Sequence, residues 1–151
     1  MPEKTSLLRE QFRNQPFARE YRMELLLLNK KRSIVSMPTY DGMWTSGNIA
    51  NGLTLGPVAN AAGVFLAMMN CKYFTPLYRV KELIFLRPTK RGLDKFLIAE
   101  ASVTGIKWHQ FKKIGKQQMI VISVMIKGSE EKIKARGIFE YILMDKEYRT
   151  K

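Results

Sequence analysis

The side chains of this sequence that could do chemistry are Asn51 and Asn60, at the start of and inside the largely apolar stretch NGLTLGPVANAAGVFLAMMN, residues 51–70. An amide side chain can donate a hydrogen bond to a negatively charged oxygen or hold a water molecule, but it cannot act as a general base. Backbone N–H groups from Gly52 to Leu55, at the start of a helix, could donate to the same oxygen. Asn51 is well placed for this chemistry. The spacing alone does not show whether Asn60 converges with it.

Both asparagines also have purely structural interpretations. Asn51 suits the N-cap of a helix, because its side chain can accept a backbone N–H of the first turn. Asn60 is equally consistent with a buried amide, hydrogen-bonded to a backbone carbonyl or across a subunit interface. The nearest acid, Asp41, precedes a glycine and is typical of the first position of a turn. From residue 42 to residue 81 there is no Asp, Glu or His, so neither asparagine has an acid or base near it in sequence.

The charge balance indicates an anionic partner. The sequence has 26 basic and 13 acidic residues, a formal net charge of +13. Such a surface attracts nucleic acid, anionic lipid or a phosphorylated ligand, although a general bias toward lysine would look the same. The single Cys71 and the single His109 provide no cluster with the spacing of a zinc site. We therefore expect no metal.

The elements that must position these side chains follow from the apolar pattern. Pro57 is tolerated only in the first turn of a helix, so the regular helix should start close to Gly56. From Val58 to Met69 the pattern has no polar face, which predicts burial on all sides. The run MIVISVMI, residues 119–126, is apolar on both faces and should lie in the middle of a sheet.

The sequence thus predicts one α+β domain spanning residues 1–151. Its expected parts are an N-terminal helical segment at residues 1–20, two strands at residues 21–40, a central helix at residues 51–70 and the remaining strands at residues 78–145. The basic stretch HQFKKIGK is expected to be a hairpin turn. The start of the chain lacks the apolar region of a secretory signal, and no window reaches the roughly 18 to 20 uninterrupted apolar residues of a membrane span. We expect a cytoplasmic protein.

This order of elements, together with two motifs, resembles the hotdog-fold acyl-CoA thioesterase superfamily from about Pro16 to Asp145. In its phenylacetate-pathway (PaaI-like) branch, G-x-x-H-G-G leads into a helix that carries an acid, and a later strand ends in F-x-R-P. Here SGNIANGLTLGPVANAAG and IFLRPTKRGLDK occupy these places. Ala50 stands where that branch has histidine, Asn51 where it has glycine, and Ala59 or Asn60 where the acid stands. The usual catalytic acid is therefore missing.

The resemblance implies a long helix wrapped by a curved antiparallel sheet, a homodimer or higher homo-oligomer, and an acyl-CoA thioester bound at the subunit interface without a further cofactor. Long-chain fatty-acyl-CoA thioesterases of the FcoT type use asparagine and tyrosine side chains in place of an acid, and this sequence looks similar in having two asparagines with Tyr40 in the preceding loop. The catalytic candidates are Asn51 and Asn60. The ligand-binding candidates, of which the last three would meet the coenzyme A phosphates, are Tyr40, Asp41, Gly52, Leu53, Arg87, Lys90 and Arg91.

Three functions remain open at this point. The first is hydrolysis of a fatty acyl-CoA, supported by asparagines. The second is binding of acyl-CoA or a fatty acid without catalysis. A distant third is single-stranded nucleic-acid binding by a basic sheet with Trp108, Phe111 and Tyr141 as stacking aromatics.

Overall fold

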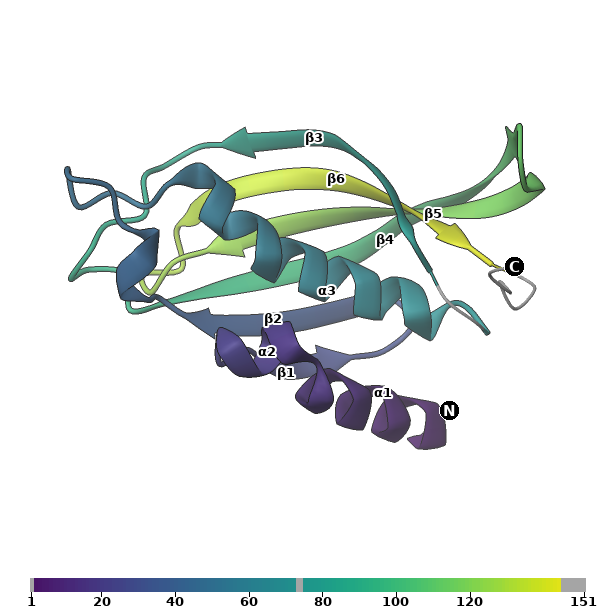
Figure 1. Cartoon of the computed structure of the whole chain (residues 1–151), viewed down its shortest axis with the longest axis horizontal. Helices are drawn as coiled ribbons and strands as arrows, with labels where there is room; N and C mark the ends of the chain where they lie inside the picture. Colours follow the sequence, from purple (N-terminus) through teal and green to yellow (C-terminus); the bar gives the residue numbers. More distant parts are fainter. Residues whose placement is uncertain (1, 73–74, 145–151) are drawn as a thin grey trace.

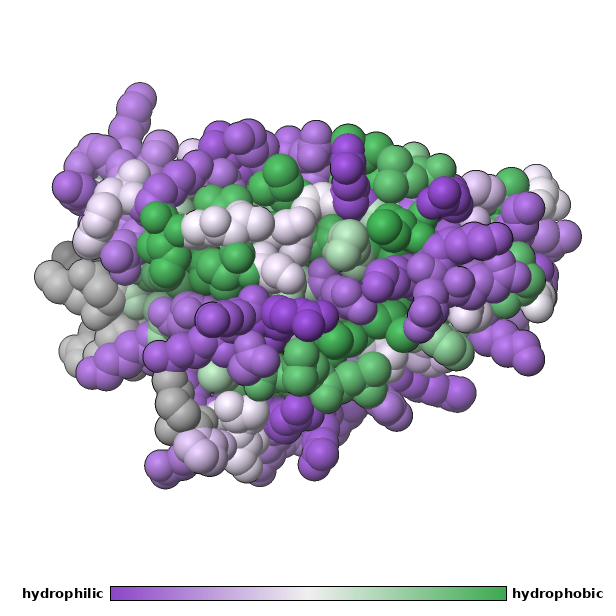
Figure 2. Space-filling view, turned by 180° about the vertical axis from the view of Figure 1, so that it is seen from behind, coloured by the Kyte–Doolittle hydropathy of each residue, from purple (hydrophilic) through white to green (hydrophobic). Residues whose placement is uncertain are grey.

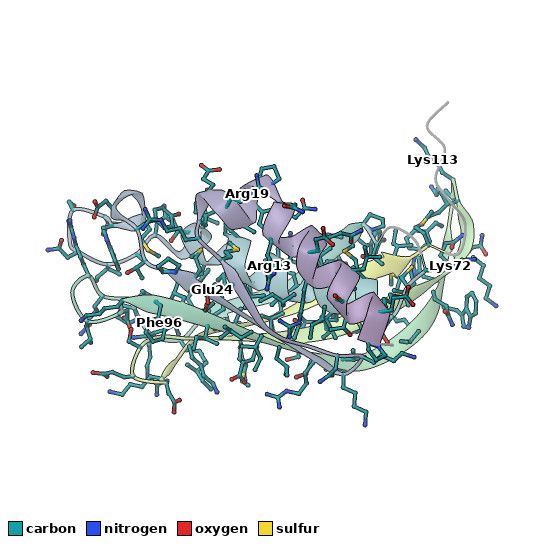
Figure 3. The ribbon with its side chains drawn as sticks, turned by 90° about the horizontal axis from the view of Figure 1, so that it is seen from below. Arg13, Arg19, Glu24, Lys72, Phe96 and Lys113 are labelled. Atoms are coloured by element: carbon teal, nitrogen blue, oxygen red, sulfur yellow. The ribbon has the colours of Figure 1, made fainter. Side chains whose placement is uncertain are left out.

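The protein consists of one layer of helices on one face of a curved antiparallel sheet (Figures 1 and 3). The structure is a computed structural model and describes residues 2–72 and 75–144, so the predicted bounds at residues 1 and 145–151 lie outside it. The helices are α1 (Pro2–Asn14), α2 (Pro16–Glu20) and α3 (Gly56–Met69), with 3-10 turns at Asp41–Met43 and Gly52–Leu55. The strands are β1 (Glu24–Leu28), β2 (Arg32–Pro38), β3 (Leu77–Phe85), β4 (Phe96–Phe111), β5 (Gly115–Lys127) and β6 (Ile133–Leu143).

All neighbouring strands are antiparallel, and their order in the sheet is β1-β2-β4-β5-β6-β3. The predicted central position of residues 119–126 is confirmed, because β5 lies between β4 and β6. The predicted α+β class, with a short N-terminal helical segment and a long helix enclosed by a curved sheet, is also confirmed. The helical segment breaks at Gln15, directly before Pro16, as the proline requires.

Helix α3 lies across the concave face of the sheet and packs chiefly on β2, β4 and β5. Pro57 is in its first turn, as predicted. The window Gly52–Met69 is long and apolar enough to cross a membrane, with a mean hydropathy of 1.5, but 56% of it is buried inside the protein. This segment is the core helix, and its apolar character is explained by burial against the sheet.

The expectation that α3 is buried on all sides is wrong for one stripe. Pro57, Asn60, Val64 and Met68 follow each other at intervals of three or four residues, and none of them is buried. Residues at this spacing lie on one face of a helix. The sheet curves around only part of α3, so this face is left uncovered.

Two strands are longer than the sequence pattern indicates. The stretch HQFKKIGK was expected to be a turn, but β4 continues through His109 to Phe111 and the turn contains only residues 112–114. The ring of His109 lies 4.5 Å from that of Phe111 and 5.8 Å from that of Tyr78, between ring centroids. Packing between aromatic rings thus extends the strand beyond the residues that favour it by propensity.

Helix α1 covers the β1 edge of the sheet and one end of the core helix. The Arg9 guanidinium donates to the Leu25 carbonyl of β1 at 2.7 Å. The Lys4 ammonium donates to the carbonyl groups of Met69 and Cys71 at the end of α3, at 3.2 and 2.5 Å. A cation at this position satisfies carbonyl groups that have no partner within the helix. Within residues 2–72 and 75–144, no helix covers the opposite edge, β3, in this way.

The convex face of the sheet, seen from behind in Figure 2, mixes apolar patches with hydrophilic side chains. Residues along β2 alternate in burial, with Val35 and Met37 fully buried and Ser36 and Pro38 partly exposed. This alternation follows from the two-residue period of a strand. The hydrophobic core therefore lies on the concave side, between the sheet and α3.

Candidate functional site at the entrance to the core helix

The two motifs that the sequence singles out lie side by side. Ile49, in the loop before α3, forms an antiparallel bridge with Lys90, in the turn after β3. The Ala50 N–H donates to the Thr89 carbonyl at 2.9 Å, and the Arg91 N–H donates to the Asn48 carbonyl at 2.9 Å. The helix entrance and the basic turn therefore form one continuous surface.

A buried ion pair fixes this basic turn. The Lys134 ammonium lies 3.1 Å from the Asp94 carboxylate, and both side chains are almost completely buried. The same carboxylate accepts the Lys90 N–H at 2.8 Å. A side chain at Gly128 would overlap the Asp94 carboxylate, so the neighbouring turn can approach only because residue 128 is glycine. A carboxylate that accepts both an ammonium and a backbone N–H holds the turn in one conformation.

Asn51 caps the 3-10 turn that precedes α3. Its Oδ1 accepts the Leu53 N–H at 3.1 Å, and its backbone carbonyl accepts the Thr54 N–H at 2.9 Å. The structure therefore has the N-cap that the sequence left open for Asn51, and two of the predicted backbone donors are used within the turn. Among the described residues none accepts from the Gly52 N–H, which remains a possible donor to a ligand.

The Gly52 backbone also lies against an aromatic ring. A Cβ atom at this position would be 3.0 Å from the ring of Phe85, at the end of β3. Phe85 itself is 48% exposed. The glycine thus lets the helix entrance and the end of β3 meet at an open surface.

Asn60 is the exposed amide on α3. Within the single chain it is neither buried nor bonded to a backbone carbonyl, so burial within one subunit is wrong, and a bond across a subunit interface stays a prediction. The hydroxyl group of Tyr141, on β6, donates to its Oδ1 at 3.0 Å. Tyr141 is fully buried, and burial raises the pKa of its hydroxyl far above the usual range. The phenol therefore stays protonated and acts only as a donor, which leaves the Asn60 Nδ2 to donate to a ligand.

Gly63 is what allows Tyr141 to reach Asn60. A side chain at Gly63, one turn further along α3, would overlap the Tyr141 hydroxyl. The sequence interpretation considered Tyr141 only as a stacking aromatic and missed its contact with Asn60. A glycine inside a helix, three residues after a polar residue, was the available signal for a close approach at this point.

The two asparagines are not paired with each other. No hydrogen bond joins Asn51 to Asn60 among the described residues, and each has its own partner. Ala59, the other candidate for the position of the missing acid, is fully buried. Of Ala59 and Asn60, the two candidates for the position of the acid, only Asn60 has a side chain that is open to a ligand.

The remaining predicted ligand-binding residues are divided between the loop and the turn. Tyr40 packs on Tyr21 with 5.3 Å between ring centroids, and burial raises the pKa of its hydroxyl. The Asp41 side chain is 98% exposed and lies 3.5 Å from the Arg91 guanidinium, which links the loop to the turn. Leu53, in the 3-10 turn, is 79% exposed.

The basic turn forms one wall of an open depression of about 570 Å³. Arg87 and Lys90 line it, together with Lys132 from the β5–β6 turn, whereas Arg91 lies outside it. Cations from two separate turns thus converge on one concave surface, and Glu130 is the acid among its lining residues. This arrangement is suited to a phosphate group.

Comparison with known proteins identifies the architecture through structure only. No family model matches the chain, and no curated protein matches its sequence. The PaaI protein of Escherichia coli, from the phenylacetic acid degradation operon, superimposes with a TM-score of 0.72 at 20% identity, covering 89% of this chain and 88% of PaaI. A thioesterase of Haemophilus influenzae gives 0.70 at 14% identity, with 91% and 87% covered. A variant of a Pseudomonas aeruginosa thioesterase gives 0.70 at 14% identity, with 91% of each chain covered.

The chain has the hotdog fold. Within this hotdog domain the described site offers amides, backbone N–H groups and cations at the helix entrance. Asp41, Asp94 and Glu130 are the described acids near it, and each of them is in an ion pair. The site can therefore stabilise negative charge, but among the described residues it presents no unpaired carboxylate at α3.

The structure does not expose together the three aromatic side chains that the sequence suggested for nucleic-acid stacking. Tyr141 is fully buried under α3, and Phe111 is only partly exposed. Trp108 is 60% exposed. One exposed ring of the three is insufficient for the row of stacked bases typical of single-strand binders.

Proposed function

We propose that this protein binds a fatty acyl-CoA thioester at the entrance to α3 and hydrolyses it with amide donors in place of a carboxylate. The observation that carries the proposal is the Asn60 side chain, an exposed amide on the core helix whose Oδ1 is held by Tyr141 at 3.0 Å. A fixed donor aimed at a developing oxyanion lowers the barrier to acyl transfer.

The apolar surface beside Asn60 is evidence that the acyl group of the ligand is a fatty acyl chain. The unburied stripe of α3 continues from Asn60 to Val64 and Met68. At the β3 edge, Leu77 and Val80 are 41% and 44% exposed, because α3 does not cover this strand. An acyl chain lying between the stripe and β3 would remove apolar surface from water.

The basic depression is evidence that the other end of the same ligand is coenzyme A. Arg87 and Lys90 face it, and the bridge between Ile49 and Lys90 ties this turn to the loop before α3. Charge-assisted contacts to phosphate would fix the nucleotide while the thioester reaches the helix entrance. Arg91, which pairs with Asp41, contributes to the same positive region.

In the proposed reaction, water adds through its oxygen to the thioester carbonyl carbon, and the C–S bond breaks. The coenzyme A sulfur leaves with a proton, and the acid product loses a proton to solvent. The Asn60 Nδ2 and the Gly52 N–H donate to the carbonyl oxygen as its negative charge develops. The Tyr141 hydroxyl cannot remove the proton from water, because burial raises its pKa far above the usual range. Turnover is therefore expected to be slow.

The proposal includes a homodimer formed through β3, beside this apolar surface. An edge strand presents unpaired N–H and C=O groups that pair readily with a second strand. The exposed apolar side chains Leu77, Val80 and Phe85 lie on this strand. Replacing Val80 with arginine should shift the protein to monomer, as measured by light scattering after gel filtration. An unchanged mass would contradict pairing through β3.

The proposed function is tested with a panel of acyl-CoAs of increasing chain length, assayed on one preparation for binding and for release of free thiol. Asn60→Ala should lower kcat at least about tenfold, with a smaller effect on binding. The surface amide Asn14 provides the matched control, and Asn14→Ala should leave both unchanged. Binding without thiol release would favour the alternative of a non-catalytic acyl-CoA or fatty-acid carrier. Wild-type turnover in Asn60→Ala would rule out the role given to this amide.

We place this activity in the cytoplasm, with coenzyme A entering as part of the substrate and no other cofactor. The proposal needs no metal. Dialysis against a chelator should therefore leave the rate of thiol release unchanged.

A further inference from the structure

The β4–β5 hairpin extends beyond the rest of the sheet and bends at its end (Figure 1). β4 has 16 residues and β5 has 13, against 9 in β3 and 11 in β6. We call residues 106–116, which end this hairpin, the hairpin tip. The site described above uses none of these residues.

The hairpin tip exposes a large apolar surface on one face. Trp108 is 60% exposed and Ile106 is 50% exposed. The two residues are separated by one position on the same strand, so they point to the same side. The Lys116 ammonium, from the facing strand, lies 5.3 Å from the centre of the Trp108 ring. A tryptophan, an aliphatic residue and a lysine thus share one exposed face.

The hairpin tip is also strongly basic. From residue 101 to residue 129 the sequence has no Asp or Glu, and Lys112 and Lys113 form the turn with exposed side chains. Figure 3 shows Lys113 at the extremity of the hairpin. Lys107 is paired with Glu140 at 2.8 Å, so the net positive charge of the tip comes from Lys112, Lys113 and Lys116.

A small second core holds the hairpin tip in place. Phe111 and Ile114 pack against the buried side chains of Met119, Ile142 and Met144. The ring of Phe111 also meets that of Tyr78 edge-on, with 5.1 Å between centroids. The exposed face of the tip is therefore presented on a packed support.

From these features we infer that the hairpin tip is a docking surface for an anionic lipid bilayer. Tryptophan is favoured at the boundary between headgroups and acyl chains, because its ring is apolar and its N–H is polar. Lysines beside it are attracted to anionic headgroups. All the cations of the tip are lysines, which suits a diffuse negative surface, whereas phosphate recognition in nucleic acids favours the bidentate arginine. Ile106 adds an aliphatic contact that base stacking would not use.

The test uses the intact chain with Trp44→Phe, which leaves Trp108 as the single tryptophan. Vesicles of phosphatidylcholine alone are compared with vesicles that also contain phosphatidylglycerol, without any acyl-CoA. Trp108 emission should shift to the blue, and the protein should sediment, only with the anionic vesicles. Lys112→Ser/Lys113→Ser in the same background should lower partitioning at least about tenfold. Trp108→Ser, made in the natural sequence, should abolish sedimentation.

The matched control is Lys30→Ser/Lys31→Ser, which removes the same charge from two adjacent exposed lysines in the β1–β2 turn, outside both the tip and the proposed site. This variant should bind anionic vesicles like its parent. An equal loss in the control would show that the overall charge binds the vesicles and would overturn the inference. Absence of vesicle binding would also overturn it, as would tip-dependent binding of a labelled single-stranded oligonucleotide in its place. The outcome does not depend on thioester hydrolysis, since no thioester is present.

Discussion

The hydroxyl group of Tyr141 donates to Oδ1 of Asn60 at 3.0 Å, directly above Gly63, where a side chain would overlap that hydroxyl. This contact joins β6 to the exposed stripe of α3. The buried Tyr141 hydroxyl thus holds the exposed Asn60 amide in place. At the proposed site Tyr141 positions the amide, and Asn60 contacts the substrate.

Tyr141→Phe should leave the fold intact and reduce turnover. The substitution keeps the buried ring and removes only the donor, so the free energy of unfolding should fall by about 1 kcal/mol. Asn60 then loses the contact that orients its amide, and kcat for acyl-CoA should drop several-fold with little change in KM. Tyr21→Phe is the control, because Tyr21 packs through its ring. Equal effects on kcat in both variants would count against a positioning role.

Gly63→Ala should destabilise the protein by about 1 to 3 kcal/mol, because the methyl group meets Tyr141 in a packed core. Combining it with Tyr141→Phe should recover part of this loss, since the overlapping hydroxyl is gone. Urea unfolding of the four proteins in this cycle measures the coupling. Gly56→Ala, on the same helix with no atom within 4 Å of the added carbon, should not destabilise. If the two glycine variants behaved alike, close approach would not explain Gly63.

The capping role of the Asn51 side chain can be tested separately from the role of its amide as a hydrogen-bond donor. Asn51→Ser keeps a side chain that caps a helix start, whereas Asn51→Ala removes the acceptor for the Leu53 N–H. Only the alanine variant should lose stability, by about 1 kcal/mol in thermal unfolding. Thiol release assayed on the serine variant then reports on the amide alone. Full activity in the serine variant would assign Asn51 to structure only.

Glu140 should make stability depend on pH in the acid range. Its carboxylate is buried between Arg79 and Lys107, at 2.5 and 2.8 Å. Burial by itself would raise the pKa of Glu140, but the hydrogen bonds and charges of these two cations hold the pKa below its usual value. A carboxyl whose pKa is lowered by folding stabilises the protein above the unfolded-state pKa, and this contribution is lost as pH falls through the folded-state pKa.

The corresponding measurement compares urea midpoints of the natural protein and Glu140→Gln from neutral to acid pH. The variant should be less stable at neutral pH, and the difference should shrink as the solution is acidified. A constant difference over the whole range would show that the ionised carboxylate is not the source of the effect.

The buried pair of Asp94 and Lys134 should tolerate double replacement better than single replacement. Lys134→Met leaves the Asp94 carboxylate buried without its cation, at a cost of about 3 to 5 kcal/mol. Adding Asp94→Asn should restore part of that loss, as seen by thermal unfolding. Affinity for coenzyme A should follow the same order, because Asp94 also holds the Lys90 N–H.

Local patterns in the sequence were sufficient to predict the main helix and strands, but they were insufficient to predict the contacts of the candidate site. Pro57 places the start of α3, and the apolar run at residues 119–126 places β5 in the sheet, because both signals act within a few residues. The contact between Asn60 and Tyr141 joins residues 81 positions apart and depends on the register that pairs Ile120 with Tyr141. No local pattern determines that register.

The uncovered face of α3 also could not be predicted from the sequence. A helix that is apolar all round gives no indication of the side on which the sheet ends. The pairing of Ile49 with Lys90 is another contact between distant segments, and it decides that the loop and the basic turn form one surface. The resemblance to hotdog proteins anticipated this neighbourhood, but the side chains within it had to be read from the structure.

The two margins of the sheet differ in a way that limits assembly. On β1, Arg9 occupies the Leu25 carbonyl, and α1 lies over the strand. None of the described helices covers β3, so in the proposed homodimer a second chain adds there in the antiparallel sense, and each copy offers the same edge strand to the other. When two β3 strands have paired, the strand at each outer edge of the joined sheet is a β1 that is covered by an α1 helix. In the proposed homodimer, growth through these strands should therefore stop at a pair and should not continue into a fibre.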